Sequence, residues 1–246
     1  MSLLSVRNVQ LRFGGITALE DVSFDVEAGT TAGLIGPNGA GKTTTFNVIT
    51  RLYDLDSGDV LMDGKSLLRT PPSRVIRHGI ARTFQNVQLF GTMTVIENVL
   101  IGAHTDSRFE RDSSVRARAL HALALVEAAD LAGRPAAGLP FGTLKRIELA
   151  RALVSHPRLL LLDEPAGGLN HEEVQELAGL IRKLRAELGL TVLLVEHHMG
   201  LVMQLSDHVN VLNFGRMIAS GPPAEIQRNP EVIEAYLGGE LEESAA

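Results

Sequence analysis

Short apolar runs alternate with stretches of helical period along most of the chain. Thr31–Ile35 and Leu159–Asp163 are almost continuously apolar, which is typical of parallel strands buried on both faces. Further strands are predicted at Ser5–Arg12, Val22–Val26, Ile80–Thr83, Thr191–Glu196 and Val209–Asn213. Helices are predicted at 41–51, 171–188 and 198–206. This alternation predicts an α/β fold made of strand and helix layers.

The stretch between about 87 and 156 has a different pattern. It has helical periodicity and almost no strand pattern, and Arg116–Ala129 is rich in alanine and leucine before the stop signals Gly133 and Pro135. We therefore expect one domain over 1–246, with a core of 1–86 and 157–246 and an inserted helical subdomain of about 87–156.

A glycine-rich segment, Gly36–Thr43, follows the predicted strand Thr31–Ile35 and precedes a predicted helix. Its spacing matches a P-loop, in which glycines let several N–H groups point at phosphate oxygens beside the positive end of a helix dipole. Lys42 is placed to reach the β- and γ-phosphates, and the Thr43 hydroxyl to ligate Mg²⁺. The strand–loop–helix context disfavours a chance glycine-rich turn. The predicted nucleotide contacts are Gly36, Pro37, Asn38, Gly39, Ala40, Gly41, Lys42, Thr43 and Thr44.

Two acids, Asp163 and Glu164, stand where the apolar strand Leu159–Asp163 ends. Ligands of parallel sheets bind beyond the carboxyl ends of the strands, so Asp163 is predicted to face Mg²⁺ and Glu164 to polarise the attacking water. Taken alone, the pair could equally be solvated acids at a strand end. The P-loop makes the functional interpretation the favoured one.

Polar side chains follow two other predicted strands. Gln85 comes after Ile80–Thr83, and an amide there can both touch the metal and sense the γ-phosphate. His197 and His198 come after Thr191–Glu196, where a histidine can donate a hydrogen bond to the γ-phosphate. Spacing alone barely separates the two histidines.

These motifs, in this order, resemble the ATPase subunits of ABC transporters over about 3–238 of the chain. The resemblance implies a P-loop NTPase (RecA-like) core with an antiparallel β edge and an inserted helical subdomain. It also implies that ATP and Mg²⁺ are the cofactors, and that an aromatic residue, here Phe13, stacks on adenine. In family terms the motifs are Walker A at Gly36–Thr43, the Q-loop at Gln85, Walker B at Leu159–Asp163, the catalytic Glu164, the D-loop at Ala166–Asn170 and the switch histidine at His197.

The signature motif departs from the family's usual Leu-Ser-Gly-Gly-Gln. The matching stretch is Leu139-Pro140-Phe141-Gly142-Thr143, with a helix predicted to begin just after Gly142. Pro140 has neither the serine hydroxyl nor an N–H, so Leu139 and Gly142 are left to make the contact across a dimer. Such a site is either one that does not hydrolyse ATP or a subgroup variant that relies on its backbone. We favour the variant, because the other catalytic positions are all present.

Several segments resemble one subgroup, the Liv-type importers of branched-chain amino acids. They are Arg82–Phe90, Met93–Val99, Asp163–Asn170, Val195–Met199 and Asn229–Gly238. The subgroup's signature often departs from the usual form, and its alignment favours His197 over His198 as the switch residue. The predicted function is therefore an ATPase subunit that energises import of branched-chain amino acids. The alternatives are a related importer for urea, amides or another small solute, or a nucleotide-gated subunit with weak turnover.

The resemblance also implies partners. They are a second ABC ATPase subunit, identical or different, transmembrane permease subunits and, indirectly, an extracytoplasmic solute-binding protein. The apolar residues Val87, Leu89, Phe90, Met93 and Val95 form either the groove in which a permease helix docks or the core of the helical subdomain itself.

Composition narrows the classes of protein to which the chain can belong. The net charge is −6, so no basic excess points to nucleic acid, and the chain has no cysteine for a disulfide, a zinc cluster or a thiol nucleophile. No apolar run approaches the roughly 20 residues of a membrane helix. The N-terminus has no signal-peptide pattern. We expect a cytoplasmic protein that is peripheral on the inner face of the membrane.

Overall fold

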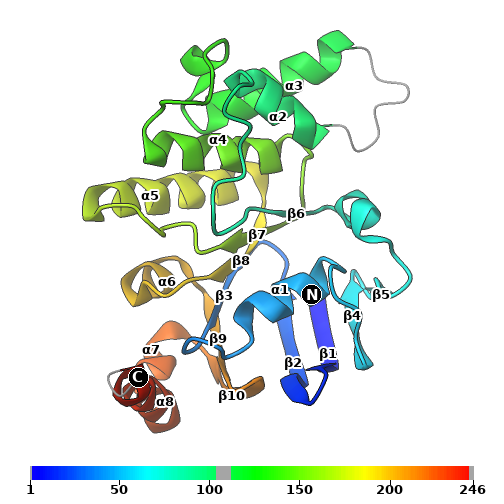
Figure 1. Cartoon of the computed structure of the whole chain (residues 1–246), viewed down its shortest axis with the longest axis vertical. Coiled ribbons are helices and arrows are strands. Elements are labelled where there is room, and N and C mark those ends of the chain that lie inside the picture. Colours follow the sequence, from blue (N-terminus) through cyan, green and yellow to red (C-terminus); the bar gives the residue numbers. More distant parts are fainter. Residues whose placement is uncertain (1, 104–111, 244–246) are drawn as a thin grey trace. The chain divides into compact units, whose positions relative to one another are not determined.

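The computed structural model describes residues 2–103 and 112–243. The chain forms two compact units, the first made of Met1–Val75 with Thr191–Ala246 and the second of Ile76–Leu190. Figure 1 shows the elements of both units, which are described separately below.

An antiparallel sheet forms part of the first unit. Its strand order is β2-β1-β4-β5, and β1 pairs antiparallel with β2 on one side and with β4 on the other. Hydrophobic side chains alternate with polar ones along β1 and β2, so one face of the sheet is buried and the other is exposed. The strands are β1 (Ser2–Phe13), β2 (Ile16–Glu27), β4 (Ser57–Met62) and β5 (Lys65–Ser66).

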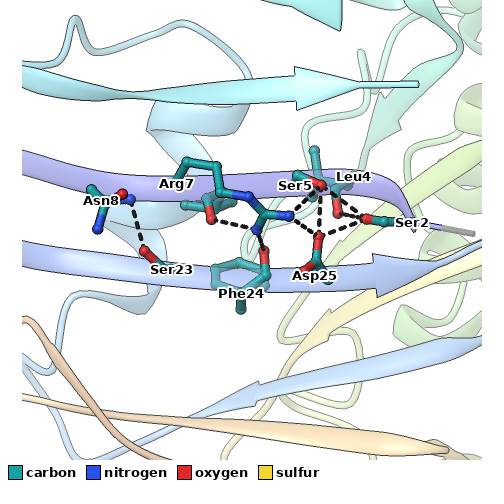
Figure 2. A network of polar contacts seen from close by, with 9 residues as sticks. Ser2, Leu4, Ser5, Arg7, Asn8, Ser23, Phe24 and Asp25 are labelled. Atoms are coloured by element: carbon teal, nitrogen blue, oxygen red, sulfur yellow. Dashed lines mark hydrogen bonds and ion pairs between the residues drawn. The ribbon is translucent and has the colours of Figure 1, made fainter. Parts of the chain in front are cut away.

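A polar network links the exposed face of β1 to β2 (Figure 2). Asp25 Oδ1 accepts hydrogen bonds from Arg7 Nη2 at 2.6 Å, from Ser5 Oγ at 2.6 Å and from Ser2 Oγ at 2.8 Å. Partial burial alone would raise the pKa of Asp25, but the bonds from Arg7, Ser5 and Ser2 outweigh it and lower that pKa. The network therefore favours the ionised carboxylate.

The same unit contains a second group of strands, in the order β10-β9-β3-β8. β3 (Thr31–Ile35) runs parallel to β8 (Thr191–Val195) and β9 (His208–Asn213), and β10 (Arg216–Gly221) is antiparallel to β9. Every residue of β3 and β8 is buried, as their continuous apolar sequences predict. The helices of this unit are α1 (Lys42–Ile49), α6 (Met199–Leu205), α7 (Pro223–Ile226) and α8 (Pro230–Glu243).

The second unit combines two parallel strands with a group of helices. β6 (Ile80–Arg82) pairs with β7 (Leu159–Asp163), and all of β7 is buried. α4 packs against α2 and α3, as Figure 1 shows in green. The helices are α2 (Val95–Ala103), α3 (Asp112–Leu125), α4 (Phe141–Leu153) and α5 (His171–Leu188), and there are short 3-10 helices at Pro72–His78 and Ala129–Leu131.

The predicted α/β fold with an antiparallel sheet is confirmed, and the strand β7 and the helix α5 have the predicted bounds. Three strands, β4, β5 and β10, were not predicted. The helix predicted at Arg116–Ala129 instead spans Asp112–Leu125, because the chain turns at Glu127 with a positive φ of 60°. Between 87 and 156, the described residues form helices and no strand.

No helix among residues 2–103 and 112–243 combines the length and apolar character that a membrane span requires.

The Asp25 network gives a pH-dependent stability. The folded-state pKa of Asp25 is lowered, so the carboxylate stabilises the fold at neutral pH and loses this effect as the pH falls through that pKa. The Arg7 and Asp25 side chains are 42% and 44% exposed, so solvent screening keeps the loss in Asp25→Asn below about 1 kcal/mol. We expect a fall in Tm of at most about 2–4 °C at pH 7, and a smaller one near pH 3.

Thermal unfolding at both pH values, followed by circular dichroism, measures this difference. The control is Asp130→Asn, which changes an exposed acid in a 3-10 helix. Equal effects of the Asp25 substitution at pH 7 and pH 3 would contradict the assignment.

Candidate ATPase site

The P-loop follows β3, and its shape depends on two glycines. Gly36 has φ 153°, and a Cβ there would lie 2.1 Å from the carbonyl oxygen of Leu212. Gly41 has φ 102°, and a Cβ would come within 3.0 Å of the Ala18 carbonyl oxygen. Since only glycine fits both positions, these two residues let the chain curl tightly from β3 into α1.

Lys42 opens α1 and folds back over this loop. Its Nζ donates to the carbonyl oxygens of Gly36 at 2.7 Å and Pro37 at 2.9 Å, and the side chain is buried. Thr43, the next residue, is exposed. The lysine charge and the threonine hydroxyl therefore both belong to the first turn of α1, whose N–H groups add a positive dipole end.

Phe13 ends β1 in the same unit, and its side chain is 46% exposed. Tyr53 supports it in an edge-on contact with ring centroids 5.1 Å apart. The β1–β2 hairpin also reaches the P-loop, because Ala18 and Leu19 of β2 contact the position of Gly41. Phe13 thus presents an aromatic ring from a hairpin that touches the loop.

In the second unit, Asp163 ends β7 as a buried carboxylate. Arg82 of β6 donates from Nη2 to Asp163 Oδ2 at 2.6 Å, and the two side chains are only 7% and 3% exposed. The guanidinium also lies over the ring of Phe84, 5.2 Å from its centroid. The pair compensates a charge that would be costly to bury alone.

The other oxygen of Asp163 bears on metal binding. Oδ1 is buried and accepts no hydrogen bond from the residues that the structure describes, so one carboxylate oxygen remains for a cation. The described part of the chain has no cluster of three or more His, Cys, Asp or Glu side chains suited to a metal. Mg²⁺ bound with a nucleotide does not need one, because it takes one or two protein ligands together with phosphates and water. The residues present fit Mg²⁺ held in that way.

Glu164 follows Asp163 with a positive φ of 46°, a conformation that is uncommon outside glycine and recurs at functional sites. The turn directs the chain away from β7 immediately after the buried acid. Gln85 Nε2 donates to Glu164 Oε2 at 2.6 Å. The structure thus brings together three of the predicted site residues, Gln85, Asp163 and Glu164, within the second unit.

The two histidines after β8 differ in their local roles. His198 is the N-cap of α6, and its Nδ1 accepts a hydrogen bond from the Leu201 N–H at 3.1 Å. Both histidines are exposed, and the N–H groups of both donate to Glu196 Oε2, at 3.1 Å from His197 and 3.2 Å from His198. One ring nitrogen of His198 is therefore committed to the helix cap, which supports His197 as the switch residue.

The signature stretch lies against the D-loop of the same unit. α4 begins at Phe141, one residue before Gly142, with Pro140 as its N-cap, so the helix starts slightly earlier than predicted. A Cβ on Gly142 would meet Glu173 Oε1 at 2.9 Å, and a Cβ on Gly168 would meet the Phe141 ring at 2.9 Å. A side chain at Gly142 or Gly168 would therefore collide with a neighbouring side chain, which favours glycine at both positions.

Asn170 and Glu173 form a capping box at the start of α5. Asn170 Oδ1 accepts from the Glu173 N–H at 3.0 Å, and Glu173 Oε2 accepts from the Asn170 N–H at 2.9 Å. The remaining members of the predicted set, Leu139 before α4 and Gly142 within it, are partly exposed.

The apolar residues after Gln85 were expected to form either a docking groove or the core of the helical subdomain, and they differ in burial. Val95 is fully buried and contributes to the core, whereas Phe90 is 54% exposed. Val87, Leu89 and Met93 are half-buried. Phe90 is therefore the residue of this run that remains available to a partner.

Sequence reasoning missed four residues of this region. Arg82, Lys145 and Glu148 are buried charged residues of the second unit, and each contacts Asp163 or the segment that carries Gln85. Tyr236 of α8 lies at the Gly36 main chain in the first unit, and burial raises its pKa to about 12. For Arg82, Lys145 and Glu148 the signal in the sequence was a charged residue at an otherwise apolar position of β6 or α4, whereas Tyr236 in α8 gave no such signal.

Comparisons with known proteins were made for the whole chain. Residues 19–167 match the family model of the ABC transporter, and residues 216–242 match that of the branched-chain amino acid ATP-binding cassette transporter. The high-affinity branched-chain amino acid transport ATP-binding proteins BraF of Pseudomonas aeruginosa and LivG of Escherichia coli are each 42% identical to the chain. Both alignments cover 96% of the chain and 98% of the relative.

Solved structures agree with the sequence matches. The ADP conformation of MJ1267, an ATP-binding cassette of an ABC transporter, superimposes with a TM-score of 0.89 at 32% identity, covering 97% of this chain and 99% of that one.

The Arg82–Asp163 pair makes a testable contribution to stability. Arg82→Met leaves a buried carboxylate without its partner, and we expect the free energy of unfolding to fall by about 3–5 kcal/mol. The double variant Arg82→Met/Asp163→Asn removes the charge as well and should recover most of that loss. Urea unfolding followed by circular dichroism measures both.

Arg216→Met serves as the control, because Arg216 pairs with Glu20 at an exposed site (64% and 40% exposed), where solvent screening makes the loss of an ion pair much smaller than at a buried one. If Arg82→Met proved no less stable than Arg216→Met, Arg82 would not compensate the buried charge of Asp163.

Proposed function

Because the chain belongs to the family of ABC transporter ATP-binding proteins, we propose that it hydrolyses ATP to energise an importer of branched-chain amino acids. Membership rests on 42% identity over 96% of the chain, and it implies nucleotide binding by the P-loop. The amino-acid assignment rests on one observation above all, the match of residues 216–242 to the branched-chain amino acid family.

We assign phosphate binding to the P-loop residues. The N–H groups between Gly36 and Thr44 surround the β- and γ-phosphates, and Lys42 exchanges its two carbonyl acceptors for phosphate oxygens. Phe13 stacks on the adenine. Thr43, Asp163 and Gln85 would hold Mg²⁺, which supplies charge neutralisation at the β- and γ-phosphates when it is bound.

Glu164 is the proposed base. It accepts a hydrogen bond from Gln85 at 2.6 Å, so the amide fixes the direction of the carboxylate. With ATP bound, Glu164 orients a water for in-line attack on the γ-phosphate, and His197 donates to a γ-phosphate oxygen. Catalysis is then mainly positioning and charge stabilisation.

We further propose that two such subunits, identical or different, act as a head-to-tail pair. Each ATP would then contact the P-loop of one subunit and the Leu139–Gly142 region of the other, with Asn170 of the D-loop nearby. Pro140 brings no hydroxyl or N–H to that contact, so the first N–H groups of α4 must carry it. The region about 87–156 would move as the helical subdomain.

The proposed partners are permease subunits in the membrane, with a solute-binding protein on the far side acting through them. The exposed Phe90 supports a docking role for the segment after Gln85. The chain would therefore work at the inner face of the membrane. Import of urea, amides or another small solute is the second candidate, because the permease and the binding protein contact the solute and the ATPase subunit does not.

Nucleotide binding should depend on Lys42. Lys42→Ala removes a charged donor, and we expect the affinity for ATP in the presence of Mg²⁺ to fall by about 10- to 100-fold. Isothermal titration calorimetry measures the affinity, and Lys65→Ala, an exposed lysine of β5, is the matched control. An affinity within twofold of the parent would contradict the phosphate-binding role.

Hydrolysis should depend on Glu164. Glu164→Gln keeps the hydrogen-bonding capacity but loses the base, so we expect kcat to fall by about 10²- to 10⁴-fold with ATP binding retained. Phosphate release measures turnover, and gel filtration with ATP reports whether a closed dimer accumulates. Glu172→Gln, an exposed acid in the first turn of α5, is the control. Hydrolysis at the parent rate would exclude Glu164 as the base.

A further inference from the structure

Three charged side chains project from one face of α4, the helix that begins in the signature stretch. Lys145, Glu148 and Arg151 are spaced three residues apart, which places them on adjacent turns of the same face. The residues Lys145 and Glu148 are 6% and 2% exposed, and the Arg151 side chain is 15% exposed. Buried charges at such positions are costly unless each has a partner.

Their partners lie in the main chain of the segment 85–88. Lys145 Nζ donates to the Gln85 carbonyl oxygen at 2.9 Å, and Arg151 Nη1 donates to the carbonyl oxygen of Gln88. Glu148 Oε1 accepts from the Gln88 N–H at 3.5 Å. The helix thus contacts both ends of the Q-loop through charged groups.

The charges of these three side chains also offset one another. Glu148 Oε1 pairs with Arg151 Nη2 at 3.3 Å. Burial raises the pKa of Glu148, and the charges of Arg151 and Lys145 act against that rise.

The Q-loop needs such partners because it is outside regular structure. β6 ends at Arg82, and the Thr83 N–H still continues the ladder by donating to the Leu161 carbonyl oxygen at 2.9 Å. Residues 84–94 belong to no strand or helix until α2 begins at Val95. Main-chain groups in such a segment must find partners elsewhere, and charge-assisted bonds from α4 supply them.

A continuous path of contacts follows from this arrangement. Lys145 holds the carbonyl group of Gln85, and the Gln85 side chain donates to Glu164 at 2.6 Å. We propose that Lys145 is a positioning residue for ATP hydrolysis, which fixes the Q-loop main chain so that Gln85 can hold Glu164 in its working direction. This inference rests on the proposed roles of Gln85 and Glu164.

The experiment compares full-length variants in steady-state phosphate release with Mg²⁺ and ATP. Lys145→Met removes the donor and the charge at nearly constant length. We expect kcat to fall by about 10- to 100-fold, the cost of a base misplaced by about 1 Å, whereas the KM for ATP changes by less than about threefold. Lys145→Arg keeps a cationic donor and should recover kcat to within about threefold of the parent.

Lys183→Met is the matched control, since this lysine on α5 is 46% exposed and should leave kcat unchanged. If Lys145→Met does not fold by circular dichroism, Lys145→Gln, which retains an amide donor and loses the charge, replaces it in every measurement.

A double-mutant cycle with Gln85→Ala separates positioning from general destabilisation. If Lys145 acts through Gln85, Lys145→Met has little further effect on kcat once the Gln85 side chain is gone. Equal and additive losses in the two backgrounds, or an unchanged kcat in Lys145→Met, would overturn the inference. If Gln85→Ala and Glu164→Gln themselves kept the parent kcat, the proposed function would fail instead.

Discussion

The ends of β6 and β7 are arranged around one carboxylate that is almost completely buried. Arg82 of the neighbouring strand donates to Asp163 at 2.6 Å, and this bond offsets the cost of burying the carboxylate. Arg82 in turn fixes the end of β6, from which the Q-loop departs, and Asp163 fixes the start of the turn that carries Glu164. The same pair leaves Oδ1 without a hydrogen bond within the described residues, so the strand pairing and the proposed Mg²⁺ contact both depend on this one interaction.

The hydrogen bond between Gln85 and Glu164 depends on how both residues are positioned. The turn at Glu164, with its φ of 46°, sets the position of the acid after β7. The amide reaches it from a loop that α4 holds by its main chain. A carboxylate on a strained turn and an amide on an irregular loop are each mobile on their own, whereas their mutual hydrogen bond and the contacts from α4 restrict both.

The sequence was sufficient for the motifs that rely on spacing and on continuous apolar runs. β3, β7 and α5 were predicted with their bounds because burial and helical periodicity leave few alternatives. β4, β5 and β10 escaped because they are short or polar and gain their order from pairing partners. Arg82 and Lys145 could not be assigned from sequence, since a charged residue has a meaning only once its buried partner, Asp163 or the Gln85 carbonyl, is known.

The unusual signature and the contacts of α4 both concern how accurately α4 is placed. A serine hydroxyl can rotate to follow a phosphate oxygen, but a main-chain N–H such as that of Gly142 has a direction set by its helix. In the proposed dimer, where Pro140 stands in place of the serine, the contact with ATP therefore requires that α4 itself be accurately placed. The bonds from Lys145 and Arg151 to the Q-loop main chain provide that placement in the second unit. We therefore expect the effect of Lys145→Met to be larger in this chain than in a relative whose signature retains its serine.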